Sequence, residues 1–198
     1  KSIERTTDTY CFHSLALPNH AYKACCEIDF LILGPEGIFA LEVKGGGVSC
    51  NEKGMWIMTD RDGREHMHRE GPFKQVQGNF FALLDRLKQS LPPDEYRSMA
   101  KGWGVVFPDC AFEVNSVEWD NATVADQRLI GHLSTWLENL VRYYQKKCGC
   151  NSGSRIAPDT LRSLRRLLRP IFERFQSLAG EIDTAEMTVN TLTEDQSH

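Results

Sequence analysis

The sequence predicts an α/β domain in which helices flank a mixed β-sheet. In the N-terminal part, short apolar runs alternate with turn signals, which is typical of consecutive antiparallel strands. Further along, apolar residues recur every three or four positions, as in amphipathic helices, and one more apolar run lies between the helical stretches. This order of strands, helix, strand and further helices favours a sandwich of helices around a sheet.

The clearest strand pair lies within residues 26–47, CEIDFLILGPEGIFALEVKGGG. It reads as strands over 26–33 and 38–44, joined by a turn of four residues, Gly34-Pro35-Glu36-Gly37. The three glycines that follow Lys44 allow a sharp turn or a close approach of the backbone. Further strands are predicted on the same grounds at residues 10–17, 55–59, 64–68 and 103–107.

Three helices are predicted from helical periodicity and from their first residues. Pro72 opens the first helix, which continues to residue 91. Asp126 begins the second, which runs to about Lys147 with Leu129 and Ile130 inward. The third covers residues 158–178, with a kink expected at Pro170.

Bulk properties limit the function classes. The net charge of −4 and the pI of about 5.9 exclude a global basic field, so any nucleic-acid contact must come from a local patch or a metal. Seven cysteines, an odd number without paired CxxC spacing, favour free thiols in a reducing compartment over zinc or a disulfide framework. No apolar run approaches the roughly 18 residues needed to span a bilayer. We therefore expect a cytoplasmic protein without a membrane partner.

Charged residues interrupt the apolar hairpin at Asp29, Glu42 and Lys44. A charge inside a buried strand is costly unless it is paired or bound to a cation. If Leu33 and Ile38 close the hairpin, the same register places Asp29 opposite Glu42, with side chains on one face. Two carboxylates at that range repel each other, and a divalent cation between them would turn the repulsion into a binding site.

An alternative interpretation needs no metal. The same charges could form a solvent-facing ladder of ion pairs on a half-exposed sheet, in which Glu27 pairs across the strands with Lys44. The pattern of charges alone does not separate the two interpretations.

The spacing of the charged residues resembles a known nuclease signature. Asp29, twelve intervening residues and then Glu42-Val43-Lys44 match the D-x(n)-(E/D)-x-K pattern of the PD-(D/E)xK nucleases. The surrounding features resemble the nuclease-related domain family, NERD, over roughly residues 10 to 110. These features follow one another as Glu27-Ile28-Asp29-Phe30, the Gly34–Gly37 turn, Leu41–Gly45, Trp56 and Gly71–Val76.

The resemblance implies a restriction-endonuclease-like mixed sheet flanked by helices, and roles for five residues. Asp29 and Glu42 would be metal ligands, with the carbonyl of Val43 as a third oxygen. Lys44 would orient the attacking water and offset phosphate charge, and Gln75 would support the metal or the phosphate. Hard oxygen ligands of this kind suit Mg²⁺ or Mn²⁺.

One feature departs from the family pattern. Such folds carry a further acidic residue on a helix before the first strand, and here only Glu4 precedes Tyr10. We expect that helix either upstream of Lys1 or missing, and in the second case metal affinity and activity would both be reduced.

The resemblance divides the chain into a nuclease-like domain over residues 1–147, a helical extension over 148–180 and a polar linker over 181–198. Within the linker, Leu192–Gln196 resembles the lead-in to the Q motif of superfamily-1 helicases. A covalently fused helicase is therefore an expected partner.

Two functional hypotheses follow. The first is a metal-dependent nuclease that hydrolyses phosphodiester bonds, with DNA favoured over RNA. The alternative is a catalytically silent module that positions DNA for a fused helicase; a protein-interaction adaptor is a third option. In both nucleic-acid hypotheses, a basic stripe on the last helix contacts the nucleic acid: Arg162, Arg165, Arg166 and Arg169. The alternative is that these arginines form an ordinary solvated helix face.

Overall fold

The computed structural model of the chain describes residues 9–20, 23–149 and 155–170. The chain divides into two compact units, Lys1–Arg165 and Arg166–His198, and the sheets and sites below belong to the first. Several predicted features lie outside the described residues: Glu4, the end of the last helix over 171–178, the linker over 181–198 and the helicase-like segment Leu192–Gln196.

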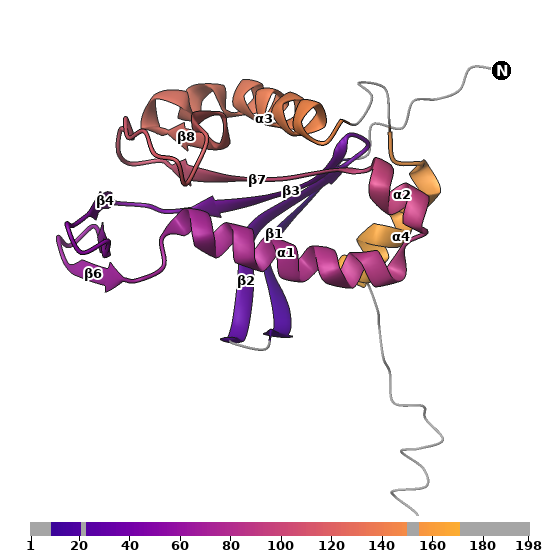
Figure 1. Cartoon of the computed structure of the whole chain (residues 1–198), viewed down its shortest axis with the longest axis horizontal. Coiled ribbons are helices and arrows are strands. Elements are labelled where there is room, and N and C mark those ends of the chain that lie inside the picture. The colour runs from indigo at the N-terminus through magenta and orange to yellow at the C-terminus, as the bar shows by residue number, and fades with distance from the viewer. Residues whose placement is uncertain (1–8, 21–22, 150–154, 171–198) are drawn as a thin grey trace, which may run out of the picture. The chain divides into compact units, whose positions relative to one another are not determined.

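A five-stranded mixed sheet forms the centre of the first unit, in the order β1-β2-β3-β7-β8 (Figure 1). The first three strands pair antiparallel, whereas β3, β7 and β8 run parallel. The α/β class is confirmed, and the arrangement is consistent with a restriction-endonuclease-like fold. The strands are β1 (Tyr10–His20), β2 (Lys23–Gly34), β3 (Gly37–Val43), β7 (Ala100–Phe107) and β8 (Val124–Asp126).

A second, three-stranded antiparallel sheet follows β3 in the chain. It lies beyond the C-terminal end of β3 (Figure 1). Two of its strands match the predictions for 55–59 and 64–68, and β4 was not predicted. Its strands are β4 (Gly47–Cys50), β5 (Trp56–Thr59) and β6 (Glu65–His68).

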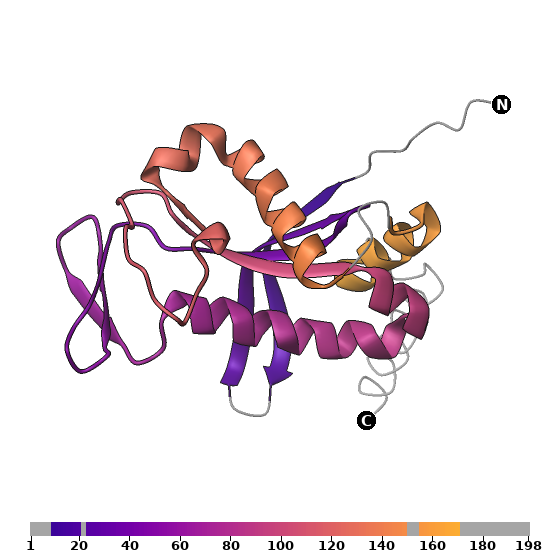
Figure 2. The ribbon, with the colours of Figure 1, turned by 45° about the horizontal axis from the view of Figure 1, so that its top comes forward.

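Helices cover both faces of the five-stranded sheet. Helix α1 (Pro72–Ser90) runs along one face, and α3 (Leu133–Lys147) packs on the other (Figures 1 and 2). The face under α3 is an apolar core that includes Phe39, Leu41 and Trp136. The remaining helices are the short α2 (Pro93–Ser98), α4 (Pro158–Leu168) and the 3-10 helices η1 (Asn121–Thr123) and η2 (Gln127–His132).

The predicted helix over 126–147 is wrong in its first part. Residues 124–126 form β8, which pairs with β7, and α3 begins only at Leu133. Leu129 and Ile130, which were expected to face inward, are 37% and 39% exposed. Pairing with the sheet edge buries the strand and so outweighs the helical pattern of the sequence.

The last helix also differs from its prediction. Helix α4 ends at Leu168, two residues before Pro170, and the part of the predicted helix after Pro170 lies outside the described residues. The residue before a proline is disfavoured in the helical region, which accounts for the early end.

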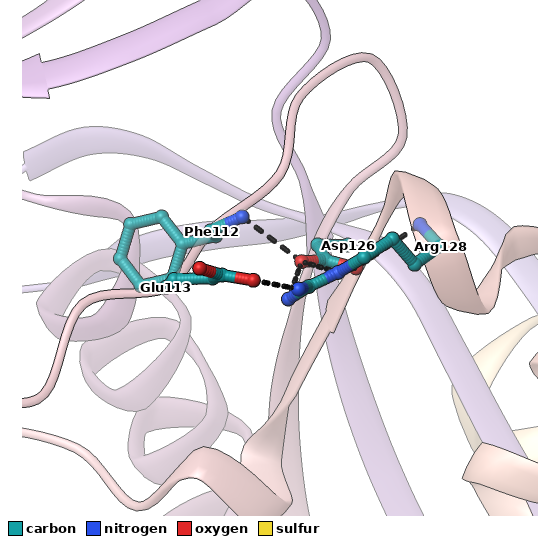
Figure 3. A network of polar contacts seen from close by, with 4 residues as sticks. All are labelled: Phe112, Glu113, Asp126 and Arg128. Atoms are coloured by element: carbon teal, nitrogen blue, oxygen red, sulfur yellow. Dashed lines mark hydrogen bonds and ion pairs between the residues drawn. The ribbon is translucent and has the colours of Figure 1, made fainter.

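A polar network holds the end of β8 (Figure 3). The carboxylate of Asp126, which is buried, accepts hydrogen bonds from the backbone N–H of Phe112 (2.9 Å) and from Nη2 of Arg128 (2.6 Å), and Arg128 also pairs with Glu113. The hydrogen bonds from Arg128 lower the pKa of Asp126. Asp126 also accepts from the backbone N–H of Arg128 and so caps η2, the helical role that its residue type predicted.

The cysteines agree with the sequence only in part. Cys11, Cys50 and Cys110 are free thiols, whereas Cys148 is in a disulfide, so the expectation of free thiols is wrong at that position. None of the helices among the described residues has the length and apolar character that crossing a bilayer would require.

Candidate metal centre

The predicted hairpin register is confirmed as far as the strands pair. Leu33 lies opposite Ile38, and the pairing continues to Phe30 opposite Leu41. Beyond this pair, a side-chain hydrogen bond replaces the backbone pairing. Oδ2 of Asp29 accepts a hydrogen bond from the backbone N–H of Val43 at 2.8 Å. Asp29 is thereby attached to the end of β3, next to Glu42.

The backbone around Asp29 is irregular on its other side as well. The pairing of β1 with β2 is interrupted at Ser14, opposite Asp29, and resumes at Leu15 with Ile28. Ser14 has a φ of 50°, in the left-handed region that residues with a side chain rarely adopt. Strained backbone of this kind gathers at functional sites.

Glu42 is buried on the face of the sheet over which α1 runs. Its neighbour Leu41 belongs to the core under α3, so strand alternation turns Glu42 to the opposite face. The side chain is only 1% exposed, and apart from the pairing of Oε1 with Lys44 its carboxylate oxygens make no hydrogen bond to another described residue. Buried polar groups are nearly always hydrogen-bonded, so this carboxylate stands out.

Lys44 supplies the opposite charge beside Glu42. Its Nζ lies 2.5 Å from Oε1 of Glu42, and its side chain is 26% exposed, so it reaches from the buried carboxylate towards solvent. The prediction that Lys44 pairs with Glu27 is therefore wrong. Residues two apart on a strand share a face, so Glu42 and Lys44 point to the same side. The lysine therefore pairs with Glu42 on its own strand and not with Glu27 across the hairpin.

Burial changes the acidity of Glu42. Desolvation raises the pKa of its carboxyl group from 4.5 to about 7; Lys44 opposes this shift, while the negative charges of Asp29 and Glu27 add to it. The charged form of Glu42 is therefore costly in the protein alone, and a cation next to it would lower that cost.

Two polar residues of α1 lie one helical turn apart. Gln75, in the first turn, is partly buried, and its side chain makes no hydrogen bond to another described residue. Asn79, four residues later and so on the same side of the helix, is buried and donates from Nδ2 to the backbone carbonyl of Glu27 at 2.6 Å. It ties α1 to β2 two residues before Asp29. The sequence analysis missed Asn79, although a polar residue within an apolar helix stripe is a usable signal.

We expect Asn79→Leu to destabilise the protein by about 1–2 kcal/mol, because it removes the hydrogen bond that the buried Asn79 side chain donates to the Glu27 carbonyl. Denaturant unfolding would measure the change. Gln89→Leu, at an exposed position near the end of the same helix, is the matched control and should alter stability by less than about 0.5 kcal/mol. Equal stability of Asn79→Leu and the wild type would contradict the anchoring role.

The loop after Lys44 is held in place by a residue from β7's end. Oδ2 of Asp109 accepts the backbone N–H of Gly46 at 2.7 Å. Gly46 has a φ of 80°, and a Cβ there would lie 2.0 Å from the carbonyl oxygen of Thr59, so only glycine fits. Asp109 was also missed; because parallel strands end at the same edge of a sheet, an acidic residue just after β7 was a signal for it.

The carboxylates near Lys44 are few. Within the described ranges, no group of three or more His, Cys, Asp or Glu side chains is arranged to hold a metal ion. The predicted donor set contains two carboxylates, Asp29 and Glu42, and the backbone carbonyl of Val43, so it needs no such group. The structure brings Asp29, Glu42 and Lys44 together at one strand end.

The basic stripe on α4 is partly engaged. Arg162 pairs with Asp159, and the guanidinium of Arg165 lies 5.1 Å from the centroid of the Tyr10 ring. Arg166 and Arg169 belong to the second unit. Contact of these arginines with nucleic acid stays a prediction.

The comparisons with known proteins bear on the same segment. The family model described as nuclease-related domain, NERD, matches residues 1–101, which is more than half of the chain. The chain belongs to the NERD family. This NERD segment contains Asp29, Glu42, Lys44 and Gln75, together with β1 to β6 and α1. No curated protein and no solved structure matched the chain.

Proposed function

We propose that this NERD domain is a metal-dependent nuclease that hydrolyses phosphodiester bonds, with DNA as the favoured substrate. The observation that carries the proposal is the carboxylate of Glu42. It is buried beside Asp29, its Oε1 forms an ion pair with Lys44 at 2.5 Å, and its Oε2 has no partner among the described residues, in a chain that belongs to a nuclease-related family.

Mg²⁺ or Mn²⁺ fits this donor set. Oε1 of Glu42 is paired with Lys44, whereas Oε2 has no partner within the described part of the chain, and a divalent cation would satisfy it. Asp29, Glu42 and the carbonyl of Val43 would hold the ion. When bound, such an ion supplies an acidic water and stabilises the charge that builds on a phosphate.

The protein's own groups would prepare the site in three ways. Asp29 is fixed to the end of β3 by the N–H of Val43, so its carboxylate is oriented before any ligand arrives. Lys44 offers a positive charge at the surface, which would orient water and offset the charge of a phosphate. Gln75, at the start of α1, would support the phosphate.

A catalytically silent binding module is the second candidate. The observation that favours it is that the described residues contain no group of three or more His, Cys, Asp or Glu side chains arranged to hold a metal ion. A silent module of this kind would bind nucleic acid without hydrolysing it. Its role would be to position DNA for a fused helicase.

Cleavage assays separate the two candidates. Plasmid and single-stranded DNA are incubated with the wild type and with Glu42→Ala, in Mg²⁺, Mn²⁺ or a chelator. We expect cleavage by the wild type that requires the metal and that falls at least about a hundredfold in Glu42→Ala. DNA binding without cleavage in either metal would favour the silent module, and equal cleavage by both proteins would refute the site.

A further inference from the structure

A cavity of about 670 Å³ lies beside the part of β7 that β8 does not cover. Strand β8 pairs with β7 only from Val105 onward, so among the described residues the edge of β7 that faces away from β3 has no strand partner at Trp103. The loop over residues 115–121 and the end of α3 close the cavity over this edge.

Three partly exposed aromatic residues line the cavity: Trp103, Trp119 and Tyr143. Trp103 is one of two residues of β7 that are not buried, an unusual position for an indole in a central strand. The backbone carbonyl of Trp103 accepts a hydrogen bond from the hydroxyl of Tyr144 at 2.9 Å, which fixes the strand against α3. Tyr143 meets Tyr144 edge to face at 5.0 Å, and Nζ of Lys147 lies 5.3 Å from the centroid of the Tyr143 ring. The ring of Tyr143 is thus held against Tyr144 and Lys147.

The polar groups of the cavity suit a base better than a phosphate. The amides of Gln77, Asn115 and Asn121 offer donors and acceptors, and Asn121 already donates to Asn115 at 2.7 Å. Glu118 and Asp120 are acidic, against a single cation, Lys147, so the lining has an excess of negative charge that repels phosphate. Aromatic faces with amide and carboxylate groups match a neutral heterocycle that carries N–H donors.

The strand register places this cavity near the candidate metal centre. Trp103 lies opposite Ala40, and Val105 lies opposite Glu42, so Trp103 and Glu42 leave the sheet on the same face. A strand spacing of about 4.8 Å and a rise of about 3.3 Å per residue put their Cα atoms roughly 8 Å apart. A short single strand could occupy both places.

We propose that this cavity binds an unpaired nucleobase of a single-stranded nucleic acid, in contact with both Trp103 and Tyr143. The proposal rests on the proposed function only for the class of ligand. It makes the domain selective for single strands, because a base inside a duplex cannot enter the cavity.

The test measures binding without hydrolysis. Fluorescence anisotropy of labelled single-stranded and duplex oligonucleotides, in a chelator, compares the wild type with Trp103→Leu and Tyr143→Leu. We expect the wild type to bind single strands more tightly than duplex, and each leucine variant to lose about tenfold in affinity for single strands. Trp103→Phe and Tyr143→Phe keep an aromatic face and should retain most of the affinity.

Controls keep a folding defect apart from a binding defect. Lys146→Ala, on α3 next to the cavity residue Lys147 but outside the lining, should bind as the wild type does. Tyr143 lies partly exposed on a helix, so its variant should unfold at the wild-type temperature. Wild-type affinity in either leucine variant would overturn the proposal, as would equal binding of single strands and duplex or no binding by the wild type. Because no metal is present, these outcomes are independent of whether the domain cleaves.

Discussion

Lys44→Ala should abolish most cleavage and leave metal binding in place. Lys44 is not a member of the predicted donor set, and its charge lies 2.5 Å from Glu42 at the exposed side of the site. Loss of a group that stabilises charge in the transition state typically costs about a hundredfold to a thousandfold in rate, or about 3–4 kcal/mol of barrier. We therefore expect at least a hundredfold slower cleavage in Mn²⁺.

The measurement pairs a cleavage rate with a calorimetric titration of Mn²⁺. Both are made at pH 8.5, because Lys44 lowers the pKa of Glu42 and its removal makes the carboxylate harder to ionise. Lys53→Ala, an exposed lysine in the turn between β4 and β5, is the matched control and should behave as the wild type. Full cleavage by Lys44→Ala would show that the lysine only pairs with Glu42.

Glu42→Gln should stabilise the metal-free protein in a manner that depends on pH. The folded-state pKa of Glu42, about 7, lies above its ordinary value of 4.5, so the folded protein binds this proton more tightly than the unfolded chain does. Its contribution to stability is therefore most favourable below pH 4.5 and declines as the pH rises to about 7. Each unit of the shift corresponds to 1.36 kcal/mol, which gives a cost of about 3 kcal/mol above pH 7.

An amide resembles the protonated acid and removes that pH-dependent cost. We expect Glu42→Gln and the wild type to differ little at pH 4.5, and the variant to be more stable by up to about 3 kcal/mol at pH 8. Denaturant unfolding in a chelator, at both pH values, measures this difference. Glu138→Gln, at an exposed position on α3, is the control and should show no such gain. A difference between Glu42→Gln and the wild type that is the same at both pH values would contradict the assigned pKa.

The sequence was sufficient for the hairpin and its charges. The four-residue turn and the apolar alternation fix the pairing of Leu33 with Ile38, and everything that depends on period 2 follows, including the placement of Asp29 near Glu42. Helix α1 was also predicted closely, because a proline begins it and a regular apolar stripe runs through it.

The remaining features depend on contacts between distant segments. The helical pattern after Asp126 gave no sign that residues 124–126 pair with β7. Asn79 and Asp109 act on backbone groups 52 and 63 residues away, so nothing in their local sequence identifies their partners. Lys44 pairs with Glu42 in place of Glu27 at the point where the ladder of β2 and β3 ends, and there the Asp29 carboxylate accepts a hydrogen bond from the backbone N–H of Val43.

The most direct test of the central claim compares cleavage of single-stranded DNA by the wild type and Glu42→Gln in Mn²⁺ at pH 8. The glutamine variant is expected to be at least as stable as the wild type at this pH, so loss of fold would not explain a loss of activity. Metal-dependent cleavage by the wild type and a rate at least about a hundredfold lower in the variant is the predicted result. Equal rates in the two proteins would contradict the claim that Glu42 holds the metal for phosphodiester hydrolysis.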